Sequence, residues 1–252
     1  MSHYHLLGRT GLRVAPLALG TMTFGWDDWG TDEDTSRQIF QRYLDWGGNF
    51  VDTAVNYGQG RSEQLLGRFI AETNTRERLV LATKFAMPTD RTDPNGSGNG
   101  RKNIMRSLDL SLSRLGTDYV DLYWLHVWDT LTPVEEVVST MDSLVRAGKV
   151  RAVGFSDVPA WYLAKAHTLA VSRGWEPVNA LQLEYSLVER NIEREHVPAA
   201  QDMGLGLVPW SPLAGGFLTG ALDEYHVRGS ATPSRAVRSL LEVSYNALFL
   251  AE

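Results

Sequence analysis

The chain has 252 residues, of which 43% are hydrophobic and 21% charged, a composition that supports a folded core and excludes disordered or collagen-like chains. Its 30 acidic residues outnumber its 24 basic residues, giving a formal net charge of -6, so we expect no nucleic-acid partner. The sequence contains no cysteine, which excludes disulfides, thiolate nucleophiles and sulfur-ligated metals within it.

The first 13 residues carry no long apolar run of the kind found in a secretory signal. No segment reaches the roughly 18 apolar residues that a membrane helix needs. We therefore expect a soluble, cytoplasmic protein with no membrane partner.

Short apolar runs alternate along the chain with stretches of helical periodicity. The predicted strands are 17–20, 49–53, 79–83, 120–125, 150–155, 179–183 and 205–209. The predicted helices between them are 34–46, 61–72, 101–115, 133–147, 159–173 and 191–203. For the fourth helix, Thr132 followed by Pro133 and Glu135 predicts an N-cap at Thr132.

This alternation predicts an α/β fold, specifically a (β/α)₈ TIM-type barrel, whose typical length is about 250 residues. The glycine-rich fingerprint of an open dinucleotide-binding sheet is missing after the first predicted strand. Three further glycines, Gly96, Gly98 and Gly100, lie among turn-forming residues and indicate a strand–helix connection rather than a phosphate cradle. We expect one barrel domain over residues 1–252.

Reactive side chains stand where three predicted strands end, which is the active-site end of a parallel barrel. Asp52 and Tyr57 follow the second strand, Lys84 the third and His126 the fourth. Each alone has a structural explanation, as a core aromatic, a rim lysine or a loop cap. A phenol, an ammonium, a carboxylate and an imidazole at one barrel mouth instead suit carbonyl reduction.

In that reaction a hydride attacks the carbonyl carbon and a proton must reach the oxygen. Tyr57 is the candidate proton donor, and the ammonium of Lys84 would lower the pKa of its phenol. Asp52 would hold the ammonium, and His126 would orient the substrate oxygen.

None of these residues supplies a hydride, so the mechanism requires a reduced nicotinamide. Ser156 and Gln182 would hold its carboxamide, and Trp210 would stack on its ring. Backbone N–H groups of residues 211–216 would approach the pyrophosphate. The alternatives are a structural aromatic for Trp210 and solvated strand-end polar groups for the other two.

The sequence resembles the aldo-keto reductases, NADPH-dependent (β/α)₈-barrel oxidoreductases with an Asp, Tyr, Lys and His tetrad. The matching segments span about residues 6–220 in family order. They are 7–14 (LGRTGLRV), 20–25 (GTMTFG), 52–54 (DTA) with Tyr57, 60–67 (GRSEQLLG), 82–84 (ATK), 118–123 (DYVDLY) with His126, 148–151 (GKVR), 182–186 (QLEYS) and 209–213 (PWSPL).

The resemblance implies that Tyr57 is the general acid, that Lys84 and Asp52 tune it, and that His126 positions the carbonyl. It implies that the cofactor is NADPH, with NADH left open. The residues that would bind it are Ser156, Gln182, Trp210, Ser211, Leu213 and Gly215. Asp157 follows Ser156 where many relatives have Asn, which puts that carboxamide contact in doubt. Loop residues Trp26, Trp29 and Trp128 would flank a small aromatic or apolar carbonyl substrate, the alternative for each being a structural role.

After residue 220 the resemblance stops, whereas relatives continue through an eighth strand and a basic segment that contacts the adenosine 2′-phosphate. Residues 221–252 show no eighth strand, and 234–252 have the pattern of a helix. We therefore expect an incomplete or atypically closed barrel, with weak binding of the adenosine end and exposed edges that favour a homo-oligomer. A naturally short protein, a missing C-terminal part and a changed reading frame all remain open as explanations. Arg228, Arg235 and Arg238 would either contact the phosphate or form a solvated face.

The leading hypothesis is an NADPH-dependent reductase that converts an aldehyde or ketone to an alcohol. One alternative is a nicotinamide-binding regulatory module with little turnover, similar to the barrel subunits that associate with potassium channels. The other is a truncated, inactive remnant.

Overall fold

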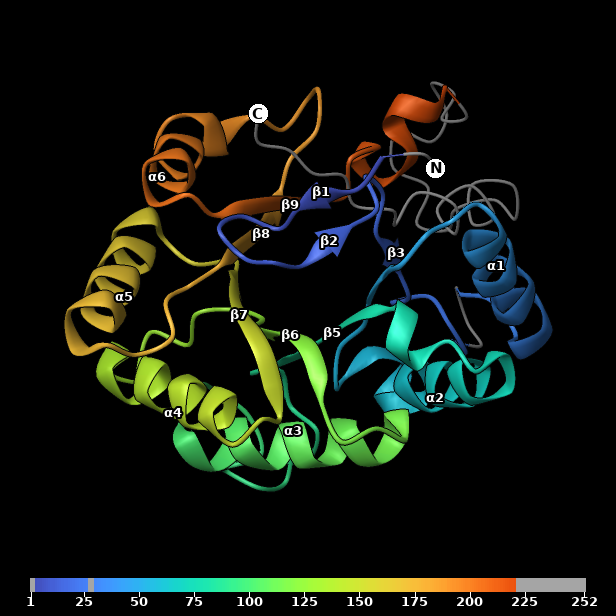
Figure 1. Cartoon of the computed structure of the whole chain (residues 1–252), viewed down its shortest axis with the longest axis horizontal. Coiled ribbons are helices and arrows are strands. Elements are labelled where there is room, and N and C mark those ends of the chain that lie inside the picture. The colour runs from blue at the N-terminus through green and yellow to red at the C-terminus, as the bar shows by residue number, and fades with distance from the viewer. Residues whose placement is uncertain (1–2, 27–29, 221–252) are drawn as a thin grey trace.

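A computed structural model describes residues 3–26 and 30–220 and shows a curved parallel sheet with helices on its outer side (Figure 1). Seven strands pair in chain order, each parallel to the next, as the alternating pattern predicted. They are β3 (Leu19–Gly20), β4 (Phe50–Asp52), β5 (Val80–Phe85), β6 (Val120–Leu125), β7 (Val150–Ser156), β8 (Ala180–Glu184) and β9 (Gly206–Trp210).

The six α-helices of the described residues connect successive strands from β3 to β9, which confirms the strand–helix repeat. They are α1 (Glu33–Asp45), α2 (Arg61–Thr73), α3 (Arg101–Leu115), α4 (Val134–Arg146), α5 (Ala160–Arg173) and α6 (His196–Met203). Short 3₁₀ turns complete the connections: η1 (Tyr57–Gly60), η2 (Arg76–Arg78), η3 (Asn191–Glu193) and η4 (Ala214–Thr219).

Two helix predictions were wrong in detail. The side chain of Thr132 does not cap α4; its hydroxyl donates instead to Asp129 at 2.6 Å, and Pro133 occupies the cap position. The helix predicted over 191–203 is split into η3 and the shorter α6. Pro198 lies in the first turn of α6, where its missing N–H costs no hydrogen bond, so the sequence accommodates a helix start at His196.

An antiparallel hairpin forms between β1 (His5–Leu6) and β2 (Arg13–Val14), and it could not be predicted because two-residue strands carry no periodicity. The hairpin lies against the amino ends of the later strands. A Cβ atom at Gly8 would lie 2.5 Å from the carbonyl oxygen of Asn179 and 2.6 Å from the amide nitrogen of Gly206. Gly8, at φ +56°, therefore permits the close approach of two backbones.

Among the described residues the sheet does not close: β3 pairs only with β4, and β9 only with β8. This agrees with the expectation of an incomplete barrel. The predicted helix over 234–252 and the three arginines at 228, 235 and 238 lie outside the described residues. In the described ranges no helix is both long and apolar enough to span a bilayer.

The sheet is packed on both sides, which makes it a rigid support for groups at its strand ends. Its outer side meets apolar helix residues such as Phe40, Leu65 and Ile104, all almost fully buried. Its inner side is filled by a second cluster around Trp124, including Phe50 and Leu122. Close packing on both faces restricts the rotamers available to side chains at the strand ends.

Candidate active site

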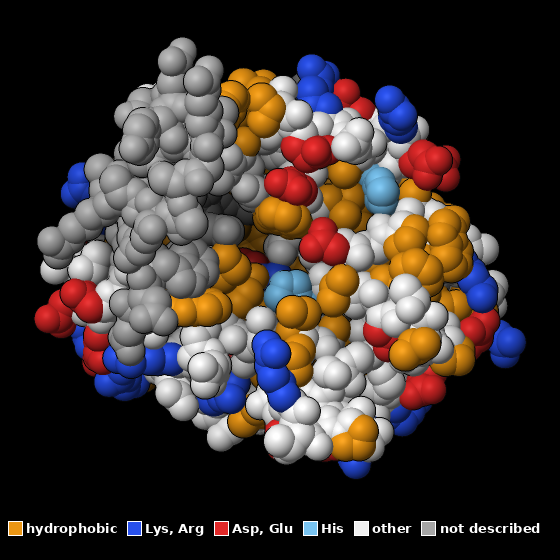
Figure 2. Space-filling view, turned by 180° about the vertical axis from the view of Figure 1, so that it is seen from behind, with side chains coloured by type: hydrophobic (Ala, Val, Ile, Leu, Met, Phe, Trp, Pro, Cys, Tyr) orange, Lys and Arg blue, Asp and Glu red, His pale blue; other side chains and the backbone are white. Residues whose placement is uncertain are grey.

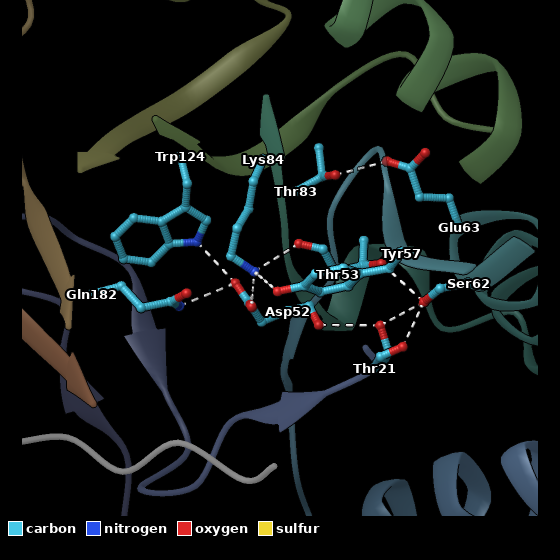
Figure 3. Close-up of polar contacts among 10 residues, drawn as sticks. All are labelled: Thr21, Asp52, Thr53, Tyr57, Ser62, Glu63, Thr83, Lys84, Trp124 and Gln182. Atoms are coloured by element: carbon cyan, nitrogen blue, oxygen red, sulfur yellow. Dashed lines mark hydrogen bonds and ion pairs between the residues drawn. The ribbon is translucent and has the colours of Figure 1, made fainter. Parts of the chain in front are cut away.

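The four residues predicted for catalysis come together at the carboxyl ends of neighbouring strands, and Figure 3 draws three of them, Asp52, Tyr57 and Lys84. Asp52 ends β4, Tyr57 begins η1 just beyond it, and Lys84 lies near the end of β5. His126 follows β6 directly, and its ring packs edge-on against that of Tyr57 with centroids 5.8 Å apart. Parallel strands bring these positions to one end of the sheet although 74 residues separate Asp52 from His126 (126 − 52).

Lys84 is the centre of the group. Its side chain is fully buried and its Nζ forms an ion pair with Asp52. The same Nζ donates to the carbonyl oxygen of Thr53 at 2.9 Å and to the Tyr57 hydroxyl at 3.2 Å. Burial opposes the charge of Lys84, but Asp52 and Tyr57 outweigh it and hold the pKa of the ammonium above its ordinary value.

The Asp52 carboxylate receives two further side-chain contacts. Trp124 Nε1 donates to Oδ1 at 2.9 Å, and Gln182 Nε2 approaches the same oxygen at 3.4 Å. These donors and Lys84 compensate a carboxylate that is only 7% exposed, because a buried carboxylate is stable in its ionised form only when it is paired.

His126 is neutral in this setting. Burial, with a smaller contribution from the nearby Lys84 charge, lowers the pKa of the imidazole to about 3. Its Nδ1 is buried and has no hydrogen-bond partner among the described residues. A neutral imidazole carries one N–H donor, which suits hydrogen bonding to a carbonyl oxygen.

These groups border a cavity of about 290 Å³, close to the lower end of the range of roughly 300–1,000 Å³ for small-molecule sites. Figure 2 shows the face opposite to that of Figure 1, hollowed near its middle, with histidine, acidic and apolar side chains around the hollow. The cavity is lined by Gly20, Thr21, Met22, Asp52, Tyr57, His126, Ser156, Asp157, Gln182, Trp210 and Ser211.

A larger hollow of about 690 Å³ lies at the other end of the strands, against the β1–β2 hairpin. Its lining includes Ala18, Phe50 and Gly206, which stand just before or at the amino ends of β3, β4 and β9. The smaller cavity is the candidate active site because it lies at the carboxyl ends and contains the reactive groups.

The predicted cofactor residues divide into two groups. Ser156, Gln182, Trp210 and Ser211 line the cavity, whereas Leu213 and Gly215 do not. Ser156 and Gln182 are 1% and 4% exposed, so they are not solvated strand-end groups. The Ser156 hydroxyl has no hydrogen-bond partner in the described part of the chain, while Ser211 Oγ accepts from the Gly215 amide at 3.2 Å.

The tryptophans predicted to flank the substrate are not brought together. Trp26 and Trp128 do not line the cavity, and Trp29 lies outside the described residues. Trp128 packs instead against Trp161 and Tyr162, with ring centroids 5.4 and 5.7 Å away. The structural role that the sequence left open for Trp128 is the one its contacts support.

Sequence reasoning missed the ion pair between partly buried Arg114 and fully buried Glu63, which holds the Tyr57 loop. Arg114 Nη1 donates to the carbonyl oxygen of Val55 at 2.7 Å and to Glu63 at 3.1 Å. Glu63 also accepts from the Thr83 hydroxyl at 2.7 Å, which joins the loop to the residue before Lys84. Glu63 stands inside the motif at 60–67, but the sequence does not reveal its partners because they lie 20 and 51 residues away.

The profile described as "Aldo/keto reductase family" matches residues 16–248 and so extends beyond the segment covered by the motifs. The uncharacterized oxidoreductase YrpG of Bacillus subtilis is 43% identical over 243 residues, covering 92% of this chain and 73% of the relative.

Fungal enzymes are also similar. Norsolorinic acid reductase stcV of Emericella nidulans is 40% identical over 90% of this chain, and an aryl-alcohol dehydrogenase of Pestalotiopsis microspora is 38% identical over 85%. The chain spans 61% and 58% of their respective lengths. The matches therefore leave about two fifths of each fungal relative without a counterpart in this chain.

Proposed function

Because this chain belongs to the aldo/keto reductase family, we propose that it reduces an aldehyde or ketone to an alcohol. The hydride would come from a reduced nicotinamide, NADPH in preference to NADH, and the proton from Tyr57. The observation that carries the proposal is the buried Lys84, which contacts both the Asp52 carboxylate and the Tyr57 hydroxyl beside the cavity.

The direction of the hydrogen bonds suits Tyr57 as the acid. An ammonium has donors only, so Lys84 donates to the phenol oxygen and the phenol directs its own proton elsewhere. After that proton leaves, the ammonium stabilises the phenolate. Asp52 keeps Lys84 in place, and neutral His126 is suited to donate to the substrate oxygen.

The cavity also offers groups that suit a nicotinamide. Ser156 has a hydroxyl with no hydrogen-bond partner among the described residues, Gln182 carries an amide, and Trp210 presents an aromatic ring at the cavity wall. When bound, the cofactor supplies the hydride that these side chains lack. The names of the similar fungal enzymes support an aromatic carbonyl as the substrate class.

The test follows NADPH oxidation by absorbance with 4-nitrobenzaldehyde as substrate, comparing the natural chain with Tyr57→Phe. Loss of the proton donor should reduce turnover by about 10²–10⁴-fold. Tyr4→Phe is the matched control, because Tyr4 is exposed and its hydroxyl contacts only the Gly47 carbonyl oxygen among the described residues.

Equal turnover in the natural chain and Tyr57→Phe would contradict the proposed role of Tyr57. Cofactor binding without turnover on a panel of carbonyls would favour the regulatory-module alternative instead. A broad, non-cooperative thermal transition with no cofactor binding would indicate the inactive remnant.

A further inference from the structure

Among the described residues that line the cavity, one charged group has no role in carbonyl reduction, the carboxylate of Asp157. Asp157 follows β7 directly and lines the cavity with Tyr57, His126 and Trp210. Its Oδ1 accepts a hydrogen bond from Trp210 Nε1 at 3.0 Å, which fixes the carboxylate relative to the indole. Within the described part of the chain it forms no ion pair.

The other charges at the cavity cancel. Lys84 and Asp52 form a pair, and His126 is neutral because burial lowers the pKa of its imidazole to about 3. The Asp157 carboxylate therefore gives the described walls of the cavity a net negative charge. Partial desolvation raises the pKa of Asp157 above its ordinary value, although Trp210 and Lys84 both favour the ionised form.

We propose that Asp157 makes this site selective for the oxidised form of the nicotinamide cofactor over the reduced form. The inference rests on the proposed function. Oxidation leaves the dinucleotide's phosphates unchanged and gives the nicotinamide ring a positive charge, so the two forms differ at the end that would enter this cavity. A fixed carboxylate attracts the charged ring and not the neutral one.

The consequence for the reaction follows from linkage. Stabilising the oxidised cofactor shifts the equilibrium on the protein toward alcohol and oxidised cofactor, and it slows release of the oxidised cofactor. A charge pair in a partly solvated pocket should change the affinity ratio about tenfold, which corresponds to about 30 mV in the two-electron potential of the bound couple.

Asp157→Asn removes the charge with little other change. Asn keeps a carbonyl oxygen that accepts from Trp210, and Asn and Asp both tolerate the left-handed backbone that residue 157 adopts at φ 45°. The matched control is Glu184→Gln. Glu184 ends β8 opposite Trp210 in the sheet register, but it does not line the cavity.

The experiment measures the dissociation constants of NADP⁺ and NADPH by titration calorimetry at pH 8 and low salt. We expect Asp157→Asn to raise the NADP⁺/NADPH ratio of dissociation constants about tenfold, and Glu184→Gln to leave it within about twofold. Measuring the ratio cancels effects that act equally on both forms, such as the attraction of the phosphates.

The outcomes separate this inference from the proposed function. An unchanged ratio in Asp157→Asn, with both cofactors still bound, would overturn the role of Asp157 and leave the reductase proposal standing. Equal changes in the two variants would also overturn the role of Asp157, because any negative charge near the cavity would then have the same effect. If the natural chain bound neither cofactor, both proposals would fail.

Discussion

The two halves of the candidate site differ in how their polar groups are held. At the ends of β4 and β5, Asp52 and Lys84 are buried and each has several partners, including Trp124 and Thr53. At the ends of β7 and β9, Ser156, Asp157 and Trp210 line the cavity, and each side chain has at most one hydrogen-bond partner among the described residues. We call the group around Asp52 and Lys84 the donor half, and the group at the ends of β7 and β9 the open half.

The difference has a physical reason. A buried charge is tolerated only when donors or counter-charges surround it, so the donor half must be complete before anything binds. Groups that are to meet a ligand must instead keep hydrogen-bonding capacity. The comparison predicts that substitutions in the donor half change stability strongly, and that those in the open half change mainly ligand binding.

Removal of the Lys84 charge should have the largest effect on stability. Lys84→Met leaves the Asp52 carboxylate buried beside only neutral donors among the described residues, and we expect a loss of about 3–5 kcal/mol in the free energy of unfolding. Urea denaturation checks this. Asp52→Asn combined with Lys84→Met should recover part of the loss, whereas full stability of Lys84→Met alone would show that the ion pair does not hold the fold.

Two glycines compare the halves directly, because both adopt left-handed backbone. A Cβ at Gly60, in the donor half, would lie 2.2 Å from the Arg114 guanidinium carbon, while one at Gly215, beyond β9, would meet nothing within 4 Å among the described residues. We expect Gly60→Ala to cost about 2–4 kcal/mol and Gly215→Ala about 1 kcal/mol. Similar midpoints in urea for the two variants would contradict the tighter packing of the donor half.

The change of stability with pH should be smaller than these effects, but its direction is predicted. The pKa of His126 is about 3 in the folded chain and about 6.5 when unfolded, so below pH 6.5 the unfolded state binds a proton that the folded state does not. The free energy of unfolding should therefore decrease as the pH is lowered, by about 2 kcal/mol from pH 7 to pH 5.

His126→Gln should remove this part of the pH dependence, measured by urea denaturation at both pH values. Asp157 in the open half should act with the opposite sign, because its raised pKa makes the folded state bind protons more tightly just above pH 4. An identical pH profile for the natural chain and His126→Gln would show that the imidazole is not held neutral by burial.

Much of the fold was predictable because apolar runs and helical periods alternate so regularly. The strand positions were confirmed, and the candidate catalytic residues were predicted by asking which reactive residues follow each strand. The hairpin of β1 and β2 was missed because it is too short for any period, and the Thr132 cap was wrong because Asp129 competes for its hydroxyl.

From the amino-acid sequence it already follows that Asp52, Tyr57, Lys84 and His126 stand at one end of a parallel sheet, because chain direction places every strand end there. Which of their atoms meet depends on the three-dimensional packing. Trp124 donates to Asp52 from 72 residues away, and the Trp128 side chain packs on Trp161 rather than lining the cavity. Such contacts depend on how the sheet curves and how its two faces pack, and local sequence periodicity predicts neither.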